Sequence, residues 1–220
     1  MNYIESNDAS ATVTQIVDTI KGILANNKKV LWLMSGGSGG KVSVSIAKEL
    51  SGTDISNLYV TLSDERFGAV GHADENWQLL LNDGLSLPGA SLYRPLIGLD
   101  RDQTTKQFGQ WLTQTLDAVD YVIGLFGIGP DGHTAGIKPN SEAVNATEFV
   151  ASFTGEDFER ITITPKFITR IDEAVIQAFG EDKFPVIDQL LTQSVSIEQQ
   201  PAQILKDVPK VTLYSNYSVK

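Results

Sequence analysis

The loop at residues 127–133, GIGPDGH, carries His133, one of two histidines in the chain. A neutral imidazole is well suited to accept a proton near pH 7. Asp131 stands two positions earlier and could orient the ring or raise its basicity. Because the apolar run YVIGLF precedes the loop, a Pro-Asp-Gly turn would hold His133 at the end of a buried strand. We take His133 as a candidate catalytic base with Asp131 as its partner, and a structural histidine is the alternative.

The glycines of this loop also match the pattern G-x-G-x-x-G of dinucleotide-binding loops. Such a loop must open a long helix, but Pro139 ends any helix within about two turns. No acidic residue closes a second strand about 20 positions later. Cysteine is absent, and two histidines cannot build a three-histidine zinc site. We therefore expect no cofactor and no metal.

A second glycine-rich loop, SGGSGGK at residues 35–41, lies between the apolar run VLWLM and a helical pattern. A strand, such a loop and a helix form a phosphate-binding arrangement, because free N–H groups at the helix start point toward the anion. The loop is not a Walker A motif, because Val42 replaces the Ser or Thr that binds magnesium. The sequence therefore predicts that this loop, with Ser35, Gly36, Gly37 and Ser38, binds a phosphate. A flexible turn is the alternative.

Cations stand beside three other predicted strands: Arg66 in SDER, Arg160 in ERITIT and Lys183 in GEDK. The planar donors of arginine suit phosphate oxygens. For SDER the alternative is an ordinary surface ion pair, which contributes little. The formal net charge is −10, so an anionic ligand would need such a local reversal of sign. His72 lies in a polar loop, and we expect it to be exposed.

Helical and apolar segments alternate along the chain. The spacing predicts helices at 10–25, 41–50, 75–83 and 104–116 and after 180–183, and strands at 30–34, 57–62, 121–126, 159–164, 173–179 and 211–214. This alternation is typical of an α/β fold with a mainly parallel, Rossmann-like sheet and helices on both faces. In such sheets ligands bind beyond the carboxyl ends of the strands, where the loops described above would converge.

The composition, 41% hydrophobic and 20% charged over 220 residues, is ordinary for a globular protein. We find no repeat or linker and predict a single α/β domain over residues 1–220. The chain has no run of about 18 apolar residues, the length that a membrane-spanning helix needs. The start of the chain lacks the features of a signal peptide. A cytoplasmic protein without membrane contact is the simplest expectation. The sequence has no stripe of basic residues, so we expect no nucleic-acid partner.

Taken together, the motifs resemble those of the 6-phosphogluconolactonases, within the wider group of sugar-phosphate isomerases and glucosamine-6-phosphate deaminases. The resemblance runs from about Val30 to about Ala202. Its motifs are SGGS, DER followed by Asn76, GIGPDGHTA, RITIT, and G-x-x-K ending at Lys183. The deaminases carry a Tyr where this chain has Arg66, and their Asp-Gly-His loop continues toward an Asn-Glu pair. Both differences favour the lactonases.

The resemblance implies hydrolysis of 6-phospho-D-glucono-1,5-lactone to 6-phosphogluconate, a step of the pentose phosphate pathway, without metal or cofactor. It implies that His133 is the general base that activates water. The only partner expected is a small sugar-phosphate substrate, and the protein would be a monomer or a weak homo-oligomer. The residues that would bind the phosphate or sugar are Ser35, Gly36, Gly37, Ser38, Asp64, Arg66, Asn76, Gly132, Arg160 and Lys183.

The chain departs from the family pattern in two places near the motifs. Gly136-Ile-Lys-Pro follows GHTA where the family usually has Ser-Leu-Phe-Pro, and Glu75 replaces a Ser, adding negative charge near an anion site. Two other functions stay open. A sugar-phosphate isomerase or deaminase would use Asp64 or Glu65 for proton transfer at carbon. A non-catalytic sugar-phosphate sensor would keep the pocket without turnover.

Overall fold

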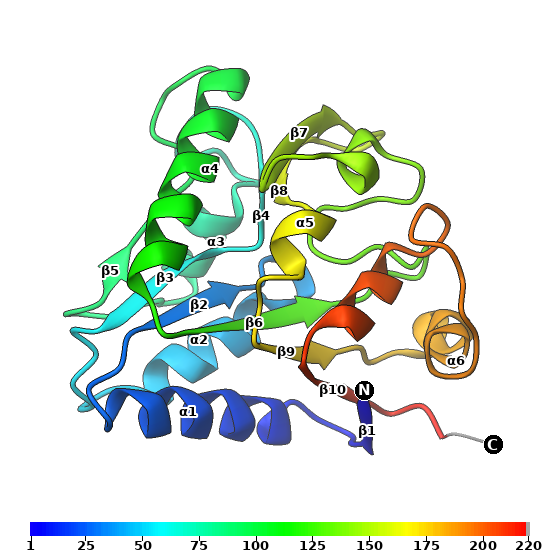
Figure 1. Cartoon of the computed structure of the whole chain (residues 1–220), viewed down its shortest axis with the longest axis horizontal. Helices are drawn as coiled ribbons and strands as arrows, with labels where there is room; N and C mark the ends of the chain where they lie inside the picture. The colour runs from blue at the N-terminus through cyan, green and yellow to red at the C-terminus, as the bar shows by residue number, and fades with distance from the viewer. Residues whose placement is uncertain (219–220) are drawn as a thin grey trace.

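The computed structural model describes residues 1–218 and contains a seven-stranded sheet in which all neighbouring strands are parallel (Figure 1). From edge to edge the strands are β1 (Asn2–Glu5), β10 (Lys210–Ser215), β9 (Glu173–Gln177), β6 (Tyr121–Gly127), β2 (Val30–Met34), β3 (Leu58–Leu62) and β5 (Ser91–Leu92). The prediction of a mainly parallel sheet is therefore confirmed.

Helices cover both faces of the sheet, as predicted (Figure 1). One face packs against α1 (Ser10–Leu24), α2 (Gly40–Glu49) and α3 (Asn76–Asn82). The other packs against α4 (Arg101–Ala118), α5 (Pro165–Ile168), α6 (Phe184–Thr192) and the 3₁₀ helix at Pro201–Asp207. Strand β2 reads as a continuous apolar run because it is buried on both sides: Leu31 joins one core, and Trp32 joins the other. None of the helices in residues 1–218 is both long and apolar enough to cross a membrane.

A second, antiparallel sheet lies over the carboxyl edge of β3. It consists of β4 (Asp64–Arg66), β8 (Glu159–Ile163) and β7 (Val150–Thr154). Ser63 joins the two sheets, because its N–H donates to Met34 O at 2.9 Å and its carbonyl accepts from Ile163 N at 3.0 Å. The strand predicted at 159–164 exists, but it pairs with the DER segment and lies outside the parallel sheet. The strands β1 and β7 were not predicted.

Candidate active site

A cavity of about 380 Å³ opens at the carboxyl edge of the parallel sheet, between the loops after β2 and β6 and the small sheet. Most residues that the motifs singled out line it: Ser35, Gly36, Gly37, Ser38, Asp64, Arg66, Asn76, His133, Arg160 and Lys183. Two do not. Asp131 lies behind His133, and Gly132 packs against the 3₁₀ helix, where its carbonyl accepts a hydrogen bond from Ala202 N at 3.0 Å. The prediction that Gly132 contacts a ligand therefore has no support in the cavity.

The glycine-rich loop at residues 35–41 makes a close approach that requires glycine. A Cβ atom on Gly36 would lie 2.3 Å from Cγ of Asn76, and Gly37 has a φ of +49°. A short 3₁₀ turn follows and leads into α2 at Gly40. The hydroxyl of Ser43 donates to Ser35 O at 3.0 Å and anchors the loop. The backbone is thus held close to Asn76 at the floor of the cavity.

The carboxylate of Glu65 fixes the backbone of Arg66 and of the first turn of α3. It is buried and accepts N–H groups from Arg66 and Asn76, both at 2.7 Å, and from Trp77 at 3.0 Å. Burial raises the pKa of Glu65 to about 8 in spite of these donors. Glu65 does not line the cavity, so its observed contacts are those of a residue that positions Arg66 and Asn76.

The two arginines lie beside one aromatic ring. Arg66 and Arg160 are paired across β4 and β8, and their Cζ atoms lie 4.5 and 5.6 Å from the ring centroid of Phe158. Cation–π contacts of this kind hold a guanidinium without neutralising it. Arg160 also contacts carboxylates, with Nη2 at 2.7 Å from Asp157 Oδ2 and Nη1 at 3.8 Å from Asp64 Oδ2. No motif in the sequence pointed to Phe158 or Asp157.

Two buried polar atoms of the cavity wall lack hydrogen-bond partners within residues 1–218. They are Nε of Arg160, a donor, and Oδ1 of Asn76, an acceptor. Leaving such a group unsatisfied costs about 1–3 kcal/mol. Both residues line the cavity, but these two atoms are themselves buried rather than exposed in it.

His133 lines the cavity and is held by Asp131. The carboxylate oxygen Oδ1 lies 2.5 Å from the ring Nδ1 and 3.1 Å from the backbone N of His133. Burial acts to raise the pKa of Asp131, but the hydrogen bonds and charge of His133, with a contact from Lys138, lower it well below its usual range. A stably ionised Asp131 accepts a hydrogen bond from Nδ1–H and leaves Nε2 as the basic nitrogen. Gly129 permits this arrangement, because a Cβ there would lie 2.1 Å from the ring.

Lys138 is a cavity residue that the motifs did not predict. Its Nζ lies 3.1 Å from Asp131 Oδ2. The only sequence signal was its place in the departure Gly136-Ile-Lys-Pro. Gly136 itself does not line the cavity. Its N–H donates to Thr162 Oγ1 at 3.0 Å, and a Cβ would lie 2.8 Å from Thr162 Cβ.

The expected negative charge of Glu75 near the anion site is compensated. Its buried carboxylate forms a bidentate pair with Arg94, at 2.6 and 2.7 Å, and does not line the cavity. Arg94 is 19 positions away in the sequence, which is why the local pattern could not show the pair. His72 is also outside the cavity, and it is half-buried rather than exposed, with Nε2 at 3.0 Å from Arg66 O.

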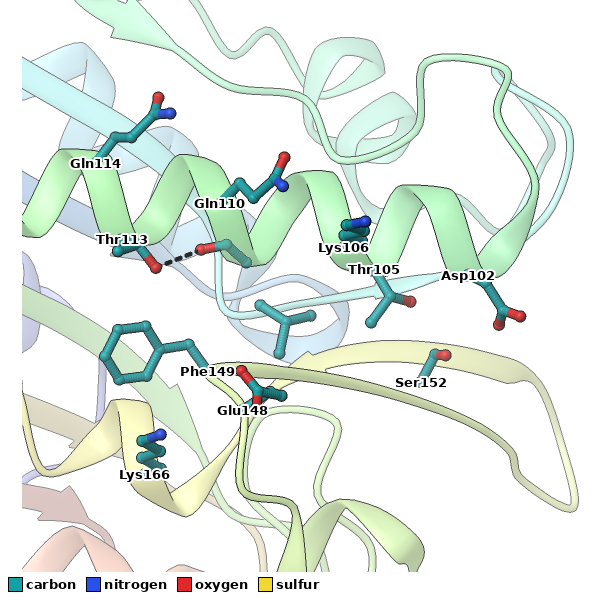
Figure 2. A pocket seen from close by; sticks show the side chains of 12 residues that line it. Asp102, Thr105, Lys106, Gln110, Thr113, Gln114, Glu148, Phe149, Ser152 and Lys166 are labelled. Carbon is teal, nitrogen blue, oxygen red and sulfur yellow. Dashed lines mark hydrogen bonds between the residues drawn. The ribbon is translucent and has the colours of Figure 1, made fainter.

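A larger cavity, of about 890 Å³, lies between α4 and β7 (Figure 2). Its walls carry amide, hydroxyl and amino groups, among them Gln110, Thr113 and Lys166. None of the residues predicted from the motifs lines it, and it contains no histidine. The smaller cavity therefore combines the features expected of an active site, although it is not the larger of the two.

Comparison with known proteins agrees with this fold and these motifs. The family model of glucosamine-6-phosphate isomerases/6-phosphogluconolactonase matches residues 5–213. The 6-phosphogluconolactonase of Synechocystis sp. is 25% identical over 161 residues, which are 68% of this chain and 66% of that protein. That of Chlamydia pneumoniae is 22% identical over 161 residues, 68% of this chain and 61% of that protein. The chain thus matches slightly less than two thirds of the length of these relatives.

The fold is shared with solved structures. A 6-phosphogluconolactonase from Shewanella baltica superimposes with a TM-score of 0.82 at 21% identity, over 98% of this chain and 97% of that one. The resemblance that the motifs predicted is confirmed by the family match, which covers almost the whole chain. This chain belongs to the family of glucosamine-6-phosphate isomerases and 6-phosphogluconolactonases.

Proposed function

We propose that this protein hydrolyses 6-phospho-D-glucono-1,5-lactone to 6-phosphogluconate, a step of the pentose phosphate pathway. One observation carries the proposal: a histidine oriented by a carboxylate shares a cavity with a glycine-rich loop and the cations Arg66, Arg160 and Lys183. The names of the relatives agree with it. A phosphorylated ester is the substrate class that needs both features.

In the proposed mechanism, Nε2 of His133 takes a proton from a water molecule that attacks the lactone carbonyl. The ring C–O bond then breaks, and the imidazolium returns the proton to the leaving oxygen. General-base catalysis of this kind supplies roughly 100- to 10,000-fold. The ionised Asp131 supports the ring by accepting a hydrogen bond from Nδ1–H. The mechanism needs no side-chain nucleophile and no metal ion, and within residues 1–218 no three His, Asp or Glu side chains are grouped to hold a metal.

The glycine-rich loop and the three cations would hold the phosphate and sugar oxygens at the other end of the substrate. These contacts position the ester, so that binding energy from groups remote from the reacting carbon assists the reaction. Arg160 and Asn76 support this role, because both line the cavity and a sugar phosphate offers oxygen acceptors for a guanidinium and hydroxyl donors for an amide. Because the chain has a formal net charge of −10, the three cations make the cavity a local region of opposite charge.

The runner-up is a sugar-phosphate isomerase or deaminase. Asp64 favours it, because this buried carboxylate lines the cavity and burial raises its pKa, as proton transfer at carbon requires. Glu65, the other carboxylate considered, does not reach the cavity. We further propose that residues 1–220 form one domain, that the protein works in the cytoplasm without a cofactor, and that it is a monomer or a weak homo-oligomer.

Hydrolysis of the lactone, measured with a coupled 6-phosphogluconate dehydrogenase against the spontaneous rate, tests the proposal. Acceleration over the spontaneous rate is expected. Release of ammonia from glucosamine-6-phosphate, with no acceleration of lactone hydrolysis, would establish the runner-up instead. Tight binding of 6-phosphogluconate without turnover of either compound would identify a sensor.

A further inference from the structure

Lys138 brings an ammonium group to the histidine of the cavity. Its Nζ lies 3.1 Å from Asp131 Oδ2 and 3.3 Å from His133 Nδ1. The other carboxylate oxygen, Oδ1, faces the ring at 2.5 Å. Asp131 therefore bridges the imidazole and the ammonium group. A rotation of the carboxylate would break both contacts, so the lysine fixes the partner of the base.

The backbone holds Lys138 at this place through a tight turn. Ile137 donates its N–H to Thr134 O at 2.9 Å, and its side chain is fully buried. Ala135 adopts a φ of +48°, a conformation that residues with a side chain rarely take. Thr134 in turn donates its hydroxyl to Gly127 O at 2.9 Å, at the end of β6. A strained, anchored turn directs the lysine back to the ring, so its position does not come from a loose loop.

Charges of both signs surround the imidazole. The groups that face it or line the same cavity are Asp131 and Lys138 from its own loop, Asp64 and Arg66 from β4, Arg160 from β8, Asp157 from the turn before β8, and Lys183 before α6. The charge of His133 acts to lower the pKa of both Asp131 and Asp64, so these two carboxylates interact with the imidazole. Among the cations of the described residues, Lys138 contacts the ring directly, with Nζ at 3.3 Å from Nδ1, and its charge opposes that of the two carboxylates.

We propose that Lys138 is a positioning residue that keeps His133 in its neutral, proton-accepting form toward lower pH. The inference rests on the proposed role of His133 as the base. A cation next to the ring disfavours the imidazolium and so extends the range in which the base is active. The same cation makes the imidazolium formed during the reaction a better acid, which assists protonation of the leaving ring oxygen.

The test compares kcat/KM between about pH 5 and about pH 8 in the wild type, Lys138→Met and Lys138→Arg. In Lys138→Met the acid limb should move to higher pH by about one unit, so that the loss is larger at low pH than at high pH. Lys138→Arg restores a cation and should bring the limb back. Lys106→Met, in the separate cavity between α4 and β7, is the matched control.

Identical acid limbs in the wild type and Lys138→Met would overturn the proposal. So would a higher KM at every pH with an unmoved limb, because that result would make Lys138 a substrate contact only.

Titration of the two imidazoles by NMR in the absence of substrate separates this inference from the proposed function. The His133 signal should titrate at higher pH in Lys138→Met, and the His72 signal should be unchanged as an internal reference. If the protein fails to hydrolyse the lactone but the His133 titration moves, the proposed function is wrong and the effect of Lys138 stands. If the lactone is hydrolysed and the titration does not move, the inference about Lys138 is wrong.

Discussion

The two edges of the parallel sheet both carry clusters of polar side chains, but only one cluster is internally satisfied. At the amino edge, the buried carboxylate of Glu173 accepts from Gln15 Nε2 at 2.7 Å, Tyr121 OH at 3.0 Å and Thr19 Oγ1 at 3.3 Å, and pairs with Lys210 Nζ at 3.0 Å. These residues come from β9, α1, β6 and β10, so the cluster ties the sheet to a helix.

At the carboxyl edge, the cluster is incomplete. Arg160 Nε and Asn76 Oδ1 are buried without partners in the described part of the chain. Arg66 is held mainly by an aromatic ring and one carbonyl. Buried polar groups that satisfy one another contribute to stability, whereas the polar side chains that line the carboxyl-edge cavity can contact a ligand. The comparison predicts that substitutions at the carboxyl edge affect catalysis, and substitutions at the amino edge affect folding.

The largest effect is expected for His133→Ala. Without the base, kcat should fall by at least about 100-fold, with 6-phosphogluconate binding within a few-fold of the wild type. Steady-state kinetics and calorimetric titration measure the two quantities. His72→Ala, the other histidine, is the control outside the cavity. Near-normal turnover in His133→Ala would remove the residue as the base.

A loss of stability without a loss of catalysis is expected for Glu173→Leu. Gln15 and Tyr121 would lose their buried acceptor, which should lower the free energy of unfolding by about 2 kcal/mol. Urea denaturation measures this change, and kcat/KM should stay near the wild-type value. Glu49→Leu, at an exposed position on α2, should have a much smaller effect. Equal stabilities of the wild type and Glu173→Leu would contradict the structural role of the amino-edge cluster.

A change in ligand affinity is expected for Arg66→Ala. We expect KM to rise roughly tenfold, inhibition by inorganic phosphate to weaken, and activity to become less sensitive to salt, because one charge-assisted contact is lost. Arg66→Lys keeps the charge but not the planar donors and should recover part of the affinity. The control is Arg170→Ala, at an exposed position. Unchanged phosphate inhibition would mean that Arg66 does not contact the anion.

The smallest effect is expected for removal of metal. Incubation with a chelator should leave lactone hydrolysis intact, since the proposed mechanism uses His133 and water alone. The assay after dialysis against the chelator measures this, with a known metalloenzyme as the positive control. Inactivation that added metal restores would show that the carboxyl edge needs an ion as well as a substrate.

Most of the carboxyl edge could be predicted because its motifs are local. The buried strand β2 is a run of apolar residues, and a loop that follows such a strand lies at the carboxyl edge whatever the details of the fold. Ser35, Arg66 and His133 follow three neighbouring parallel strands in this way. Their convergence at one cavity was therefore implied by the alternation of helices and strands.

Contacts between distant segments become visible only in the folded chain. Residue patterns alone predicted the parallel sheet, the glycine-rich loops and the candidate base, since periodicity and turn chemistry depend on neighbouring residues. They did not predict that β8 pairs with β4, that Phe158 lies beside Arg66, or that Arg94 neutralises Glu75. These contacts join residues that are far apart in the sequence. Hydrophobic periodicity describes each segment separately and does not indicate which distant segments pack together.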